Sequence, residues 1–427
     1  MTQRPPALDQ APGAYAYYVL SMLFLVLATS LIDRNVLGIL LEDIKAELQI
    51  SDTQRGLLTG AAFAVTNAIA GIPLARLADR WSRRDIVAWG LLSWSGLTAL
   101  QGLTRTFGML LVTRIGVGIG EASTGPSAHS LISDYFPLRQ RATAISIYTI
   151  GGHLGVWVAF LVGGWLSDAY SWRTALVAVG LPGILLSLLF RFTVREPVRG
   201  AIEGQVDTGQ AVPLGELVRV LSRKPTFRHI AMALPLFVCA SYVLNIWGPA
   251  FLMRVHGLTK TEIGLWFGLI VGVGGGVGSI AGGLLSDRLA RRDRRWYAWL
   301  PAVATVSAVP FYVGFLLAPD PWVALGLLIP VVLLNATTIA PLWAANQAIS
   351  PLRVRATSYA VIHLGISAIS GGLAPLIVGS LNDLLAPGLG EHAIRYSLFL
   401  IVGTNLWGAF HAYMAAHRLP GDLPGPR

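Results

Sequence analysis

Long apolar runs, each followed by a short polar turn, recur from the beginning of the chain to its end. A helix needs roughly 20 apolar residues to cross a hydrocarbon core about 30 Å thick, and most of the runs have about that length. The pattern therefore predicts an all-α membrane protein with twelve spanning helices. The predicted spans lie near residues 16–41, 55–75, 85–104, 107–132, 141–165, 172–192, 229–252, 261–283, 296–317, 321–349, 355–380 and 394–417.

One polar stretch is much longer than the other turns and divides the chain. It runs from residue 194 to residue 228 and is rich in Arg, Glu and Asp. We therefore predict two pseudo-symmetric six-helix bundles, over residues 1–192 and 229–427, joined by a cytoplasmic linker over residues 193–228.

Composition supports a lipid environment. The mean hydropathy is +0.61 and only 13% of the residues are charged, whereas charged residues make up about a quarter of soluble domains. The net charge of +10 comes from Arg and Lys residues that collect in the turns on one predicted side, as in cytoplasmic loops. This pattern predicts cytoplasmic termini and contact with membrane lipids, and it argues against nucleic acid as a partner.

A turn motif occurs once in each half of the chain. Residues 75–84 read Ala-Arg-Leu-Ala-Asp-Arg-Trp-Ser-Arg-Arg, and residues 283–292 read Gly-Leu-Leu-Ser-Asp-Arg-Leu-Ala-Arg-Arg. Both resemble the signature loop of the major facilitator superfamily, although Ala75 and Ser82 replace its usual glycines. The resemblance implies the major facilitator fold and a cytoplasmic gate formed by Asp79, Arg80, Arg83, Arg84, Asp287, Arg288, Arg291 and Arg292. The simpler interpretation is that these charges only set the orientation in the membrane.

Four charged residues stand out because they lie well inside predicted spans, away from the ends, where an ionised group is costly unless it lines a cavity or is paired. They are Asp33 and Arg34 in the first span, and Arg114 and Glu121 in the fourth. At about 1.5 Å per residue, Asp33 and Arg114 have matching depths, so we expect them to approach each other. Glu121 is further from Arg114 and is the better candidate for protonation near neutral pH. The alternatives are a solvated position at the outer interface for Asp33 and Arg34, and a purely structural buried pair for Glu121.

Other polar and aromatic residues in the spans are weaker candidates. His153, Asn245, Trp247 and Trp343 could line a cavity, although such residues more often serve packing or bonds between helices. The sequence has no nucleophile elbow and no His-Glu metal motif, so we expect no catalytic residues and no metal ligands. The chain is thus predicted to be no enzyme and to use no cofactor, and the protonatable Glu121 favours a proton as coupling ion.

The first half closely resembles the spinster family of that superfamily, and the second half resembles it through its architecture and signature loop. The similar segments are residues 114–122, 133–137, 172–173, 180–183 and 195–197, together with the pair Asp33-Arg34. The resemblance implies a monomeric secondary transporter in a bacterial inner membrane, which moves lysophospholipids or sphingosine-1-phosphate-like lipids with proton coupling. The apolar middles of the later spans would suit a lipid chain. The alternatives are a proton-coupled carrier of organic anions such as sugar acids, a multidrug efflux transporter and, from another class, a membrane-embedded enzyme or a lipid sensor.

Overall fold

The fold is known from a computed structural model, which describes residues 13–197, 222–350 and 355–423. These residues are almost entirely helical, and no strand occurs among them. The expected linker falls largely on residues 198–221, which lie outside the described residues.

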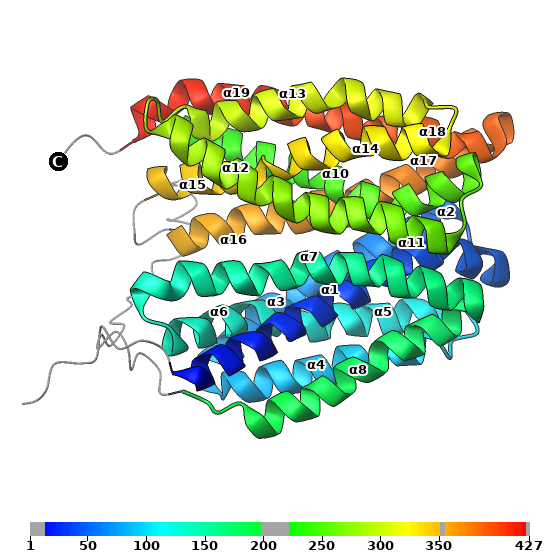
Figure 1. The fold of residues 1–427 in the computed structure, drawn as a ribbon, viewed down its shortest axis with the longest axis horizontal. Helices are drawn as coiled ribbons and strands as arrows, with labels where there is room; N and C mark the ends of the chain where they lie inside the picture. Colours follow the sequence, from blue (N-terminus) through cyan, green and yellow to red (C-terminus); the bar gives the residue numbers. More distant parts are fainter. Residues whose placement is uncertain (1–12, 198–221, 351–354, 424–427) are drawn as a thin grey trace, which may run out of the picture. The chain divides into compact units, whose positions relative to one another are not determined.

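Helices of the first half follow one another with short turns (Figure 1). They are α1 (Ala14–Leu48), α2 (Asp52–Gly56), η1 (Leu57–Ala61), α3 (Ala62–Arg80), α4 (Arg83–Gln101), α5 (Phe107–Glu121), α6 (Thr124–Tyr135), α7 (Leu138–Ala169) and α8 (Trp172–Thr193). Side-chain caps begin several of them. Ser51 and Gln54 form a capping box at α2, and Ser171 accepts the amide of Thr174 at α8, which satisfies amides that a helix start leaves unpaired.

The second half has the same character. Its helices are α10 (Pro225–His256), α11 (Lys260–Leu269), η2 (Ile270–Gly274), α12 (Gly275–Ala290), α13 (Trp296–Leu317), α14 (Pro321–Ala336), α15 (Ile339–Ile349), α16 (Arg355–Gly365), η4 (Ile366–Leu373), α17 (Ala374–Leu389), η5 (Gly390–His392), α18 (Ala393–Ser397) and α19 (Phe399–Asp422). The elements η1, η2 and η4 are π-helical turns that continue their α-helical neighbours, so each interrupted span stays helical throughout.

The predicted spans agree with these helices. Every one of the twelve falls on helical segments of the described chain, and eight helical stretches there are long and apolar enough to cross a membrane. The last of these stretches, from Ser358 to Asp422, has 65 residues and accommodates two crossings. The fourth predicted span is broken, because α5 ends at Glu121 and α6 begins at Thr124. The protein is therefore an all-α, multi-pass membrane protein.

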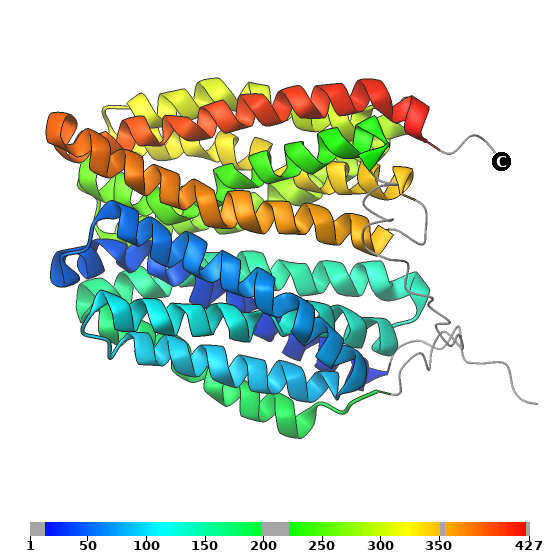
Figure 2. The ribbon, with the colours of Figure 1, turned by 180° about the vertical axis from the view of Figure 1, so that it is seen from behind.

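Contacts within the described chain group it into two compact units. Residues 13–40 and 65–197 form unit 1, whereas residues 41–64 group with residues from 222 onward in unit 2. The stretch 41–64 lies inside the range 1–192 that we expected to form the first bundle. It belongs to unit 2 because α2 and η1 pack along α17 and η4, and both views place α2 beside α17 (Figures 1 and 2).

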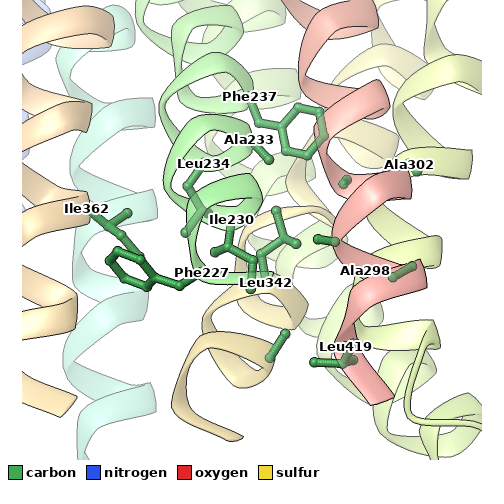
Figure 3. Packing of buried hydrophobic residues seen from close by; sticks show 14 of the residues in the cluster. Phe227, Ile230, Ala233, Leu234, Phe237, Ala298, Ala302, Leu342, Ile362 and Leu419 are labelled. Atoms are coloured by element: carbon green, nitrogen blue, oxygen red, sulfur yellow. The ribbon is translucent and has the colours of Figure 1, made fainter. Parts of the chain in front are cut away.

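Unit 2 has an apolar core made of residues from five α-helices and the π-helical turn η4. Phe227, Ile230, Leu234 and Phe237 follow one face of α10, and small residues of α13 and α19 fit against them (Figure 3). The side chains of Leu342 from α15 and Ile362 from α16 close the same cluster. The i, i+3, i+4 spacing along α10 puts the large side chains on one stripe, so the helices can pack closely around it.

Unit 1 relies on small residues where its helices cross. A Cβ atom added to Gly155 of α7 would lie 2.4 Å from the carbonyl oxygen of Ala28 in α1, and one added to Gly183 of α8 would lie 2.1 Å from Ser95 Oγ in α4. Only glycine permits these approaches. They bring the backbones of α1, α4, α7 and α8 close together around the charged residues described next.

Candidate functional site

Asp33 and Arg34 are consecutive residues of α1, so their side chains point about 100° apart around the helix. Within unit 1 they therefore meet different neighbours. Arg34 turns toward α5, and Asp33 turns toward α4. With Arg114 and Glu121 they form what we call the intramembrane cluster.

The closest contact of this cluster is an ion pair between Arg34 and Glu121. Arg34 Nη2 lies 2.6 Å from Glu121 Oε2, and Ser30 Oγ donates to the same oxygen at 3.0 Å. The Glu121 side chain is only 1% exposed, whereas that of Arg34 is 28% exposed. A group that enters from the accessible side would therefore meet the guanidinium of Arg34 first.

Arg114 lies deeper, with 1% of its surface exposed. Its guanidinium reaches the backbone of α1, where Nη1 lies 3.4 Å from the carbonyl oxygen of Asp33 and Nη2 lies 3.5 Å from that of Arg34. These are long hydrogen bonds. Arg114 thus lies near Asp33 as expected, but its guanidinium contacts the backbone carbonyl oxygen of Asp33.

The carboxylate of Asp33 is buried and has no hydrogen-bond partner at either oxygen. The hydroxyls of Ser95 and Thr98 in α4 lie beside it, and the charges of Glu121 and Arg114 act on it. The pairing therefore differs from our expectation: Glu121 holds the short ion pair, and Asp33 is the carboxylate without a direct partner. The reason is the rotation of α1 about its axis, which points the side chain of Arg34 toward Glu121.

The first signature loop contains a second set of ion pairs. Arg83 is almost fully buried, its Nε lies 2.8 Å from Glu196 Oε1, and its Nη1 contacts Asp134 and Ser130. Burial opposes the charge, but the bonds to Asp134 and Glu196 hold the Arg83 pKa above its usual value. Sequence reasoning missed both acidic partners, which come from distant helix ends.

The other expected gate residues whose side chains are described are more exposed than Arg83. Arg84 pairs with Asp85 at 2.8 Å, and Arg80 is exposed. The Asp79 side chain lies outside the described part of the chain. In unit 2, Asp287 accepts a hydrogen bond of 3.1 Å from the Tyr297 hydroxyl. Its neighbours in the loop are exposed, namely Arg288, Arg291 and Arg292.

The four expected cavity residues have different surroundings. His153 is half-buried on α7, as is Asn245 on α10. Trp343 is half-buried and stacks on Tyr359, with ring centroids 4.5 Å apart. Trp247 is fully buried, donates to the carbonyl oxygen of Pro375 and has its ring centroid 4.9 Å from the Arg55 guanidinium.

Unit 2 has a charged cluster of its own, which we call the turn cluster: Glu42, Lys45, Asp52, Arg55, Arg254 and Asp383. Arg254 contacts both oxygens of Asp52, at 2.6 and 2.8 Å, and also pairs with Glu42. Arg55 pairs with the same two carboxylates. Most of the cluster borders a pocket of about 420 Å³.

Hydrogen bonds also connect the turn cluster to α17. Asp383 accepts the backbone amides of Asp52 and Thr53, at 3.0 and 2.7 Å. The sequence analysis singled out neither Glu42 and Asp52 nor Arg254 as functional residues. The only available signal was an Arg at the end of a span, which is common.

Together, the helical membrane fold and a buried, electrically balanced cluster of charges define a membrane transporter. The chain belongs to the Major Facilitator Superfamily, whose sequence profile matches residues 23–375. Within that superfamily it belongs with the spinster-type transporters. It is a transporter and not an enzyme.

Several relatives support this assignment. The chain is 32% identical to an MFS-type efflux pump of Mycolicibacterium smegmatis, over 96% of this chain and 94% of the relative. It is 27% identical to protein spinster homolog 1 of Xenopus tropicalis, over 91% and 78% of the two chains. It is also 29% identical to a cis,cis-muconate transport protein of Acinetobacter baylyi, over 70% and 71%.

A solved structure agrees with the sequence relatives. It is that of a bacterial homologue of the human lysosomal transporter Spinster, in an inward-facing and unoccupied conformation. The TM-score is 0.87 at 30% identity, and the match covers 98% of this chain and 100% of the other. The fold of the present chain is therefore that of a major facilitator.

Proposed function

We propose that this protein is a proton-coupled secondary transporter of an amphiphilic lipid with an anionic or zwitterionic head group, such as a lysophospholipid or a sphingosine-1-phosphate-like lipid. It works by alternating access, as a monomer in a bacterial inner membrane with cytoplasmic termini. The single observation that supports this best is the Arg34–Glu121 pair, in which the cation is accessible and the carboxylate is buried.

The charges of the intramembrane cluster favour coupling between an anion and a proton. Asp33, Glu121, Arg34 and Arg114 sum to zero when all are ionised. A phosphate that binds Arg34 adds negative charge in a low-dielectric region, where an unbalanced charge costs several kcal/mol. Uptake of a proton by one of the two carboxylates restores the balance. Substrate and proton binding then stabilise each other.

Transport into liposomes tests this proposal. The purified chain is reconstituted and supplied with lysophosphatidylethanolamine of two chain lengths, sphingosine-1-phosphate or cis,cis-muconate, with and without a pH gradient. We expect uptake of at least one lipid to depend on the gradient and on chain length. Glu121→Gln and Arg114→Gln should remove this dependence, whereas Arg418→Gln, at an exposed position of α19, should not. Gradient-driven lipid uptake that is unchanged in Glu121→Gln and Arg114→Gln would overturn the proposal.

The second candidate is an organic-anion carrier. It is favoured by the similarity to a cis,cis-muconate transport protein, and because Arg34 and Arg114 would bind a carboxylate as readily as a phosphate. The same assay separates the two functions. An organic-anion carrier should transport muconate and respond little to the length of a lipid chain.

A further inference from the structure

One face of α4 in unit 1 carries an unusual number of buried polar groups without partners. Trp94, Ser95, Thr98 and Gln101 are each at most 1% exposed. Five of their polar atoms have no hydrogen bond: Trp94 Nε1, Ser95 Oγ, Thr98 Oγ1, Gln101 Oε1 and Gln101 Nε2. Because more than about 90% of buried polar groups in proteins are bonded, five on a single helix face require an explanation.

Other hydroxyls in the same unit show that this arrangement is specific. Ser123 and Ser127 donate to backbone carbonyls one turn back, at 2.8 and 2.9 Å, as hydroxyls in helices usually do. Ser187 of α8 donates to the carbonyl oxygen of Ala88 at 3.0 Å. In contrast, the hydroxyls of Ser95 and Thr98 bond to no carbonyl and instead interact with the carboxylate of Asp33.

The positions of these groups follow a line along α4. Trp94, Thr98 and Gln101 have i, i+4, i+7 spacing and so form one stripe, with Ser95 beside it. Gln101 is the last residue of α4, about 4.5 Å along the axis from Thr98. The next turn is partly exposed, at Leu103 and Arg105. The stripe therefore leads from Asp33 to the end of unit 1 that has the α4–α5 turn.

We propose that Ser95, Thr98 and Gln101 hold one or two water molecules that link the Asp33 carboxyl group to the membrane face at the α4–α5 turn, and that protons reach Asp33 along this path. A buried water makes about three hydrogen bonds and needs two to four polar partners, which these side chains supply. In the orientation proposed above, this face is the outer one.

The two consecutive residues of α1 then have separate roles. Arg34 meets the substrate on its accessible side, and Asp33 exchanges protons on the side of α4. Both lie within one helical step, so a change at either alters the charge balance of the same cluster. The inference rests on the proposed function for its physiological meaning, but the water path can be tested without any substrate.

Infrared spectroscopy of the reconstituted protein provides that test. The C=O stretch of a protonated carboxyl group is recorded from about pH 8 to about pH 4, and its rate of hydrogen–deuterium exchange is measured at low pH. Asp33→Asn should remove the band assigned to Asp33, whereas Glu121→Gln should leave it. The double variant Thr98→Val, Gln101→Leu should slow its exchange by at least about tenfold, which is a barrier higher by about 1.4 kcal/mol.

Ser187→Ala is the matched control, because it removes a buried hydroxyl between α4 and α8 that already has a partner. We expect its exchange rate to match that of the wild type. Unchanged exchange in the double variant would overturn the proposal, and so would the absence of any Asp33-dependent band. The single variants Thr98→Val and Gln101→Leu should each give a smaller slowing, which guards against a folding defect in the double variant.

The two proposals fail separately. Loss of gradient dependence in wild-type transport would contradict the proposed function and would leave the exchange result intact. Normal gradient-driven transport together with fast exchange in the double variant would contradict only the water path.

Discussion

The intramembrane cluster and the turn cluster use the same residue types in opposite ways. In the turn cluster, Asp52 accepts bonds from Arg254, Arg55 and Lys45, with distances from 2.6 to 3.1 Å. In the intramembrane cluster, Arg34 forms a short ion pair with Glu121, whereas Arg114 contacts carbonyl oxygens of α1 at 3.4 and 3.5 Å. Both oxygens of Asp33 lack a hydrogen bond.

This difference in hydrogen bonding indicates which of the two clusters can bind and release ligands such as a proton. A carboxylate that accepts hydrogen bonds from several charged donors is strongly stabilised as an anion, so its protonation is unfavourable. A carboxylate beside hydroxyls and a distant guanidinium is less strongly stabilised as an anion, so protonating it costs less free energy. We therefore infer that the turn cluster stabilises the packing of α2 against α10 and α17 within unit 2. The intramembrane cluster, in contrast, takes part in transport.

The largest effect is expected from Arg34→Gln. This variant leaves the carboxylate of Glu121 buried with the hydrogen bond from Ser30 but without its ion pair, and loss of one member of a buried pair costs about 3 kcal/mol or more. Arg34 is also the proposed partner of the substrate phosphate, and we expect a similar loss of binding free energy, so transport of lysophosphatidylethanolamine into liposomes should fall by about 100-fold. Initial uptake rates measure the effect.

A double variant provides the control for that result. Arg34→Gln combined with Glu121→Gln removes both charges, so the unfolding temperature should recover toward that of the wild type while transport remains lost. If the double variant is less stable than Arg34→Gln alone, the two residues do not stabilise each other as a pair.

The next largest effect is expected for Asp52→Asn in the turn cluster, with a loss of about 2 kcal/mol of unfolding free energy. Burial opposes ionisation, but the bonds from Arg254 and the charges of Arg55 and Arg254 hold the pKa of Asp52 well below its usual range. A lowered carboxyl pKa gives stability that is complete above the unfolded pKa of about 4 and is lost as the pH falls below it.

The penalty of Asp52→Asn should therefore be the same at pH 8 and at pH 5, and should shrink only below about pH 4. Thermal unfolding of the detergent-solubilised protein, followed by intrinsic fluorescence, measures it. A penalty that already declines between pH 8 and pH 5 would show that Asp52 titrates in the range where transport is coupled, contrary to the comparison of the two clusters.

Much of this architecture could be predicted because a segment that crosses the lipid must be apolar over a defined length. Apolar runs located all twelve spans, since their length is set by the thickness of the membrane. The four charges inside spans identified the intramembrane cluster for the same reason, because a charge in that environment is rare.

The pairing within the clusters could not be predicted in the same way. Which carboxylate meets Arg34 depends on the rotation of α1 about its axis, and spacing along α1 alone does not determine this rotation. The stripe on α4 consists of Ser, Thr and Gln, which are ordinary residues in a span. Arg254 sits where spans usually end in a positive charge, so nothing in the sequence connected it to Asp52.

A smaller effect is expected for Arg83→Lys in the first signature loop. Lysine keeps the charge but loses the planar fork that contacts Asp134 and Glu196, so we expect a loss of about 1 kcal/mol. Arg80→Lys, in the same loop but exposed, should leave the unfolding temperature unchanged. Equal effects of the two variants would mean that Arg83 acts only as a point charge.

Effects no larger than this are expected from a matched pair of hydroxyls, one bonded to each cluster. Ser30 Oγ donates to Glu121 Oε2 at 3.0 Å, and Thr53 Oγ1 donates to Asp383 Oδ2 at 2.6 Å. Ser30→Ala and Thr53→Val should each cost about 1 kcal/mol, the net value of one such bond. Only Ser30→Ala should shift the pH dependence of transport, because its bond stabilises a carboxylate that competes with substrate for Arg34. A pH profile that moves as much with Thr53→Val would place both clusters in the transport cycle.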